Sequence, residues 1–133
     1  MTAPSKQSED EKTLSELQER IMEYSQILSR YSAQERVASS RKHRTELTLA
    51  ELQPLPDTTR SYKAVGKAYF LASKASVCAD AEKAIADSSV EIDSVRQQRS
   101  AVEQKMKEAQ AEFRELLSSN ASLSRQLAAM QAR

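Results

Sequence analysis

The stretch RSYKAVGKAYFLA, from Arg60 to Ala72, decides how this chain of 133 residues folds. It contains Gly66, the only glycine of the chain, and β-forming side chains alternate on either side of it. A tight hairpin turn needs a residue with a positive φ, which glycine adopts without steric cost. The stretch therefore predicts a β-hairpin within residues 60–72, with its turn at Gly66.

The alternative is a helix that continues across the same residues. Pro54 and Pro56 lie just upstream, and each removes a backbone donor and fixes its own φ. These prolines and the Tyr69-Phe70 pair favour strands. A single hairpin is marginal in water and has two unpaired edges, so we expect it to add to hairpins of other subunits. The side chains that it offers for this are Tyr62, Val65, Tyr69, Phe70 and Leu71.

The residues before the hairpin have the spacing of a coiled-coil helix. Apolar residues recur there at alternating steps of three and four, which keeps them in one seam along one side of a helix. They are Leu14, Leu17, Ile21, Tyr24, Leu28 and Tyr31, and the same step continues to Glu35 and Ala38. We predict a disordered polar tail over residues 1–8 and a helical arm over residues 9–45.

Residues 46–59 are expected to form a capped turn and a linker. Thr48 stands three residues before Glu51, which is the spacing of a capping box at the start of a short helical turn. The basic run before it, Arg41 to Arg44, has two interpretations: a phosphate contact, or cations in the last turns of a helix, where the helix dipole favours them. We prefer the second, because a phosphate-binding surface normally carries a larger basic excess.

The residues after the hairpin keep the same periodicity to the end of the chain. From Cys78 to Met130 the alternation of three and four never slips, which is rare for a chance amphipathic helix. Ser73 can cap this second helical arm, which we predict over residues 73–133. The sequence thus predicts a mostly α fold in a single domain over residues 1–133, namely a long antiparallel two-helix coiled coil with one β-hairpin at the bend.

The second arm is longer than the first, so residues 118–133 are expected to overhang. Asn120, a polar residue of the seam, would mark where pairing stops. Beyond it Leu123, Leu127 and Met130 would have no partner within the chain. An apolar stripe left open at a tip is a candidate binding surface. The alternative is a tail that frays or pairs with a neighbouring molecule.

The composition argues against an enzyme. One glycine, one histidine (His43) and one cysteine (Cys78) are too few for a phosphate-cradling loop, a metal cluster or a catalytic triad. No cofactor is expected, and a net charge of +1 gives no general attraction to nucleic acid. The single cysteine and the polar first residues predict a cytoplasmic location. No apolar run is long enough to span a membrane.

One pattern in the hairpin is specific: Tyr62-x-x-Val65-Gly66-Lys67-x-Tyr69-x-Leu71. Around it stand Lys42-His43, Leu47-Thr48, Glu51, Thr59 and Ser73-Lys74. This set of residues resembles the β class of prefoldin subunits, which belong to an ATP-independent chaperone. The resemblance covers residues 9–117, and it departs from the family at Tyr69, where phenylalanine is usual.

The resemblance implies a heterohexamer of two α-class and four β-class subunits, whose hairpins form a double β-barrel from which the coiled coils hang. It implies that the tips hold unfolded actin and tubulin and pass them to the cytosolic group II chaperonin. The assembly residues would be Tyr62, Val65, Gly66, Tyr69, Phe70 and Leu71. The client-contact candidates at the arm tips would be Leu14, Leu17, Leu123, Leu127 and Met130.

Two other functions remain open alternatives. The first is a coiled-coil scaffold or tether whose hairpin docks on another protein, and such a protein would tolerate the loss of free apolar tips. The second is a nucleic-acid adaptor that uses Arg41 to Arg44, whose binding would fall steeply with salt. The near-zero net charge argues against the second.

Overall fold

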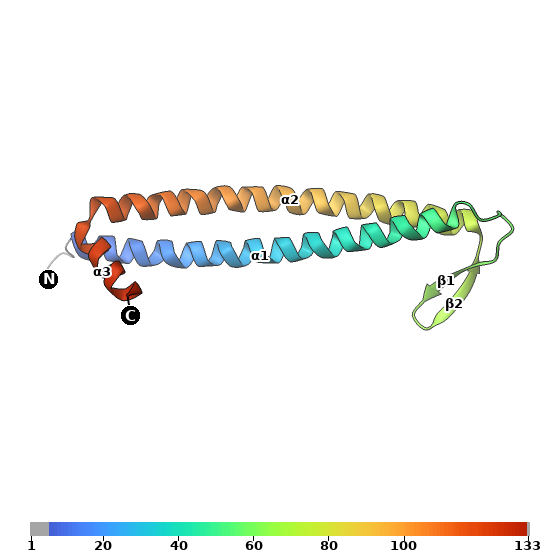
Figure 1. The fold of residues 1–133 in the computed structure, drawn as a ribbon, viewed down its shortest axis with the longest axis horizontal. Coiled ribbons are helices and arrows are strands. Elements are labelled where there is room, and N and C mark those ends of the chain that lie inside the picture. The colour runs from blue at the N-terminus through green and yellow to red at the C-terminus, as the bar shows by residue number, and fades with distance from the viewer. Residues whose placement is uncertain (1–5, 133) are drawn as a thin grey trace. The chain divides into compact units, whose positions relative to one another are not determined.

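The computed structural model describes residues 6–132 of the chain, and Figure 1 shows their helices and strands. The elements are, in chain order, α1 (Lys6–Leu52), β1 (Ser61–Val65), β2 (Ala68–Ala72), α2 (Lys74–Ser119) and α3 (Ala121–Gln131). They fall into two compact units. The first unit holds the described residues up to Arg30 together with those from Gln98 onward, and the second is Tyr31–Gln97.

Within each unit, α1 and α2 run antiparallel. In the second unit Arg96 Nε lies 2.8 Å from Glu35 Oε1, and Arg41 Nη1 lies 3.3 Å from Glu91 Oε2. Residues further along α1 therefore pair with residues earlier in α2. In the first unit the early residues of α1 meet the end of α2, where Asn120 Nδ2 donates a hydrogen bond of 3.2 Å to an oxygen of Asp10. The predicted antiparallel pairing is confirmed in both units.

The side chains between α1 and α2 are those that the 3–4 spacing selects. Most are half-buried, because a pair of helices covers only one side of each partner. The buried members of the predicted seams are Leu14, Leu17, Ala38, Ser88, Ile92, Val95 and Ala109 on α1 and α2, and Leu123 on α3. The seam of the coiled coil is thus confirmed by burial.

The first helix is longer than predicted at both ends. α1 begins at Lys6, inside the expected tail, whereas residues 1–5 lie outside the described residues. It continues through residue 45 to Leu52, so the capping box at Thr48 was wrong. The Thr48 hydroxyl instead donates a hydrogen bond of 3.0 Å to the carbonyl oxygen of Arg44, one turn back in the same helix. The half-buried seam continues over these turns through Lys42, Thr45, Leu49 and Leu52.

The second helical arm, predicted as one helix over residues 73–133, is broken near its end. α2 ends at Ser119, and Asn120 takes an extended conformation with φ −133° and ψ 95° before α3 begins. The start of α2 follows the prediction, because the Ser73 hydroxyl accepts a hydrogen bond of 3.1 Å from the Ser76 N–H. In the described part of the chain, no helix combines the length and the apolar character needed to cross a bilayer.

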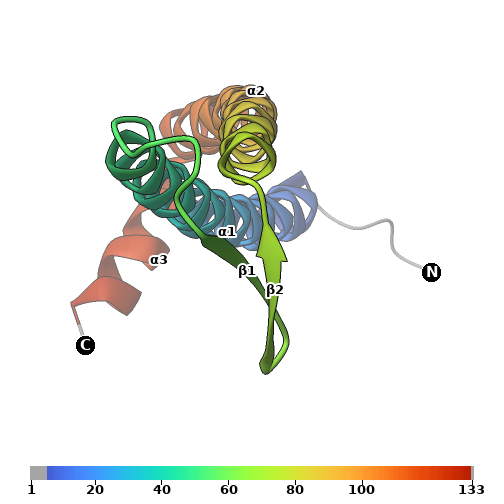
Figure 2. The same ribbon diagram turned by 90° about the vertical axis from the view of Figure 1, so that its right-hand side faces the viewer.

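The predicted hairpin is confirmed. β1 and β2 pair antiparallel, with Tyr62 opposite Leu71 and Val65 opposite Ala68 (Figure 2). Gly66 has a φ of 62°, and no other residue among 6–132 has a positive φ. A turn whose first central residue has a positive φ and whose second, Lys67, has a negative one is of type II′, which matches the twist of paired strands.

Candidate functional site

One face of the hairpin is apolar, aromatic and open to solvent. Residues that lie opposite each other on paired strands share a face, so the register places Tyr62 and Leu71 together with Ala64 and Tyr69. We call these four residues the open face. Leu71 is 69% exposed and Tyr69 is 75% exposed. Three large side chains left in water on one small surface indicate an interaction site.

The opposite face of the hairpin is fixed to α2 at its base. Lys63 forms an ion pair with Asp80, and its Nζ donates a hydrogen bond of 2.8 Å to the Ser76 hydroxyl. Toward the turn the same face carries Val65 and Phe70, which are both exposed. The hairpin is therefore held at one end, while its turn end and its open face remain accessible.

The structure gathers all six predicted assembly residues on this hairpin. Tyr62, Tyr69 and Leu71 lie on the open face, Val65 and Phe70 lie on the opposite face, and Gly66 lies in the turn. Among residues 6–132 the sheet has two strands, so each strand has one edge whose backbone groups lack a strand partner. Binding of a partner hairpin at these edges stays a prediction.

Sequence reasoning gave no role to Lys74, which joins the end of α1 to the start of α2. Its Nζ donates hydrogen bonds of 2.8 Å to the carbonyl oxygen of Gln53 and 2.6 Å to that of Leu55. The side chain is only 13% exposed. These carbonyls follow the last turn of α1, where the helix itself leaves acceptors unpaired. The available signal was a lysine directly after the helix cap Ser73.

The leucines predicted as open tips are buried in the first unit. Leu14 is buried, Leu17 is 3% exposed and Leu123 is 2% exposed. The expected overhang was therefore wrong for Leu123, whereas Leu14 and Leu17 are buried as members of the predicted seam. Leu127 is half-buried, and Met130 is 73% exposed. Client contact by any of the five stays a prediction.

Asn120 is the physical reason for this difference. Its Oδ1 accepts a hydrogen bond of 3.2 Å from the Leu123 N–H, which caps α3. Its Nδ2 donates to Oδ2 of Asp10, also at 3.2 Å. One side chain thus ends α2, starts α3 and ties this point to α1.

A shallow, open groove of about 350 Å³ lies beside the buried leucines at the same end of the first unit. Its walls are formed by Thr13 and Leu17 of α1, and by Glu112, Glu115, Leu116 and Ser119 of α2. Two apolar side chains lie beside two carboxylates. This lining suits an apolar group that neighbours a positive charge.

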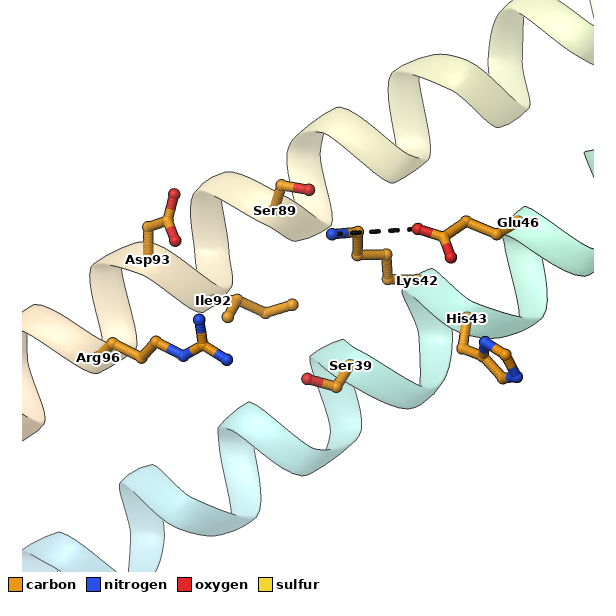
Figure 3. Close-up of a pocket in the computed structure, with 8 residues that line it drawn as sticks. All are labelled: Ser39, Lys42, His43, Glu46, Ser89, Ile92, Asp93 and Arg96. Atoms are coloured by element: carbon orange, nitrogen blue, oxygen red, sulfur yellow. Dashed lines mark ion pairs between the residues drawn. The ribbon is translucent and has the colours of Figure 1, made fainter.

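The basic run lies within α1 and faces carboxylates. Arg41 pairs with Glu91, and Lys42 lies 4.0 Å from Glu46 (Figure 3). Because α1 ends only at Leu52, the account that placed these cations in the last turns of a helix was wrong. His43 lines the same open groove as Lys42, and Ser89, Ile92, Asp93 and Arg96 face them from α2.

Known proteins share this arrangement. A family model described as prefoldin subunit matches residues 15–120. Prefoldin subunit 1 of Arabidopsis thaliana is 29% identical over 115 residues, which cover 86% of this chain and 90% of that protein. The crystal structure of the prefoldin beta subunit from Thermococcus strain KS-1 matches with a TM-score of 0.71 at 21% identity, over 90% of this chain and 96% of that one. The resemblance predicted from the hairpin motif is thus confirmed.

Proposed function

The chain belongs to the prefoldin subunit family, and from this membership we propose that it is a β-class subunit, of the subunit 1 type, in a heterohexameric chaperone. Prefoldin subunits assemble with other prefoldin subunits. The observation that carries the proposal for this chain is the exposed hairpin, whose open face presents Tyr62, Tyr69 and Leu71 to solvent. A single hairpin fits the β class.

Burial energetics support assembly through the hairpin. Each strand has five residues, and a two-stranded sheet of this size is marginal alone in water. Full burial of one large apolar side chain contributes roughly 1.5–3 kcal/mol. A partner that covered the open face would therefore supply several kcal/mol, and strand pairing at the two edges would satisfy the backbone groups there.

We extend the proposal to what the assembly does. It would bind unfolded chains such as actin and tubulin in the cytoplasm without ATP, and deliver them to the cytosolic group II chaperonin. The chain would have no enzymatic activity, and it would bind neither nucleic acid nor membrane. Weak contacts from several subunits around one client would add up to a strong but reversible hold. The ion pairs of Arg41 and Lys42 support this function over a nucleic-acid adaptor.

The test is the native mass of the full chain after co-expression with candidate α-class and β-class prefoldin subunits. We expect a single species of six chains that contains this chain once. A homodimer, or a monomer that ignores those partners, would refute the chaperone function and favour a coiled-coil scaffold whose hairpin docks elsewhere. Capture of unfolded actin by the purified hexamer, without nucleotide, then tests the client.

A further inference from the structure

The helix α3 is held in place by contacts within the first unit. It has 11 residues, and an isolated helix of that length is not stable in water. Its largest anchor is Leu123, which is the most buried large side chain of the described residues. α3 leaves the end of α2 at a sharp turn (Figure 1). Tertiary contacts, and not helix propensity, therefore keep α3 folded.

The contact between Asn120 and Asp10 sets where α3 lies. Leu14 follows Asp10 by one helical turn on the same face of α1, and Leu123 follows Asn120 by one turn. The hydrogen bond of 3.2 Å between Asp10 and Asn120 places this turn of α1 beside the first turn of α3. Leu14 and Leu123 are both buried there, which indicates that α3 covers the end of the seam.

Charge also matches between α3 and the surface that it occupies. From Ala121 to Gln131 the helix has no acidic residue, and its one charged residue is Arg125. The surface has an acidic excess: Glu9, Asp10 and Glu11 outnumber Lys12 in the first turns of α1, and Glu112 and Glu115 line the adjacent groove on either side of Arg114. A neutral or basic segment is therefore favoured at this site over an acidic one.

We propose that the ends of α1 and α2 in the first unit form a docking surface for a short amphipathic helical segment without acidic residues, and that α3 is its built-in occupant. The inference rests on the proposed function, in which the outside partner is such a segment of an unfolded client. The segment would carry leucines one turn apart, as Leu123 and Leu127 are in α3. α3 must leave before the client segment docks.

Tethering gives α3 an advantage over any free segment. A short covalent link holds it near the surface at an effective concentration on the order of millimolar. A free segment of equal affinity therefore binds only when α3 is weakened or when other subunits hold the same client.

The test uses the full chain and a fluorescent peptide with the sequence of residues 119–132. In one variant Asn120→Ala and Leu123→Ala together release α3. We expect this variant to bind the peptide at least about tenfold more tightly than the original chain, because the tethered competitor is lost. Ser124→Ala, at an exposed position of α3, is the matched control and should leave binding unchanged.

Two further peptides test what the surface recognises. One has Leu123→Asp and Leu127→Asp, and it should not bind the released variant. The other has Arg125→Glu and Gln126→Glu, and it should bind several-fold more weakly, with the difference shrinking as salt rises. Equal binding of all three peptides to the released variant would overturn the docking surface. The same conclusion would follow if the unchanged peptide bound the original chain as tightly as it binds the released variant.

Hydrogen exchange shows whether the released variant is still folded. We expect faster exchange in residues 121–131 and unchanged exchange in residues 20–50 of α1. Unchanged exchange in residues 121–131 would show that Asn120 and Leu123 do not hold α3 in place. Peptide binding is measured on this chain alone, whereas the proposed function is tested by the mass of the hexamer. A hexamer whose released subunit ignores the peptide would refute only the docking surface, and peptide binding by a chain that never joins a hexamer would refute only the proposed function.

Discussion

At the scale of single residues, two lysines of the second unit fix the hairpin and the linker that leads into it. Lys63 binds Ser76 and Asp80 on α2, and Lys74 binds two carbonyl oxygens beyond the end of α1. Lys63 holds the hairpin itself and Lys74 holds the linker that leads into it, and neither forms part of the open face. Their loss should therefore affect how the hairpin is held more than what it offers to partners.

The first prediction concerns Lys74→Met, which keeps the apolar stem and removes the ammonium group. Two short hydrogen bonds to Gln53 and Leu55 are lost, both made by a side chain that is only 13% exposed. We expect the free energy of unfolding to fall by about 2 kcal/mol. Urea unfolding followed by circular dichroism measures it. Lys107→Met, at an exposed position of α2, is the control and should change stability by less than about 0.5 kcal/mol.

Two polar residues show what the sequence could not decide. Thr48 and Asn120 both have short side chains that can bond to the nearby backbone. Thr48 donates to a carbonyl within a continuing helix, whereas Asn120 accepts from an N–H and starts a new one. The local sequence permits both outcomes at each position. The packing of Leu52 in the seam and of Leu123 in the first unit decides between them, and that packing is tertiary.

At the scale of elements, the sequence predicted the two helices, whose apolar spacing repeats, and the hairpin, which contains the only glycine. The seam recurs through many heptads, so one polar interruption such as Ser88 does not hide it. The hairpin was predictable because Gly66 is the only residue that takes a positive φ cheaply, and the structure gives it a φ of 62°. Helix ends were predicted less well, because a basic run and a Thr-x-x-Glu spacing also occur within helices.

The second prediction concerns the hairpin as an element. Val65→Asp with Leu71→Asp places one carboxylate on each face of the hairpin, on side chains that are exposed in this chain. We expect helical content to stay unchanged by circular dichroism, because neither residue packs in the seam. Assembly should be lost, since burial of an unpaired carboxylate is costly. Co-expression and native mass measure this loss.

A control substitution distinguishes the effect of carboxylates on the hairpin faces from the effect of added negative charge alone. Lys67→Asp changes the charge at the turn, one position from Gly66, and should leave the mass of the assembly unchanged. Survival of the hexamer with both carboxylates in the strands would contradict assembly through these faces.

At the scale of the whole molecule, little apolar surface is fully buried within one chain. In the described residues, the buried apolar side chains are seven: Leu14, Leu17, Ala38, Ile92, Val95, Ala109 and Leu123. The other apolar seam residues are half-buried, except Met130, which is exposed. We therefore expect a chain with so small a core and so few turn residues to gain part of its stability from partners.

The third prediction follows for the chain without partners. Its open hairpin edges and open face should pair with those of other copies, so its mean mass should rise with concentration. Sedimentation equilibrium from low micromolar to several hundred micromolar measures this rise. The Val65→Asp, Leu71→Asp variant should remain monomeric over the same range. A mass that stays constant for the unchanged chain would contradict self-association through the hairpin.

The antiparallel seam also limits how such a gene can change in length. One inserted codon within α1 would rotate every later seam residue by about 100° around the helix, away from α2. Seven inserted residues restore the phase, but they also shift α1 along α2 and separate pairs such as Glu35–Arg96. A tolerated insertion therefore requires a second one of equal length in the other helix. Lengthening or shortening of these arms should be inherited as matched pairs of heptads, whereas the exposed linker between Leu55 and β1, beyond the carbonyls that Lys74 holds, should vary by single residues.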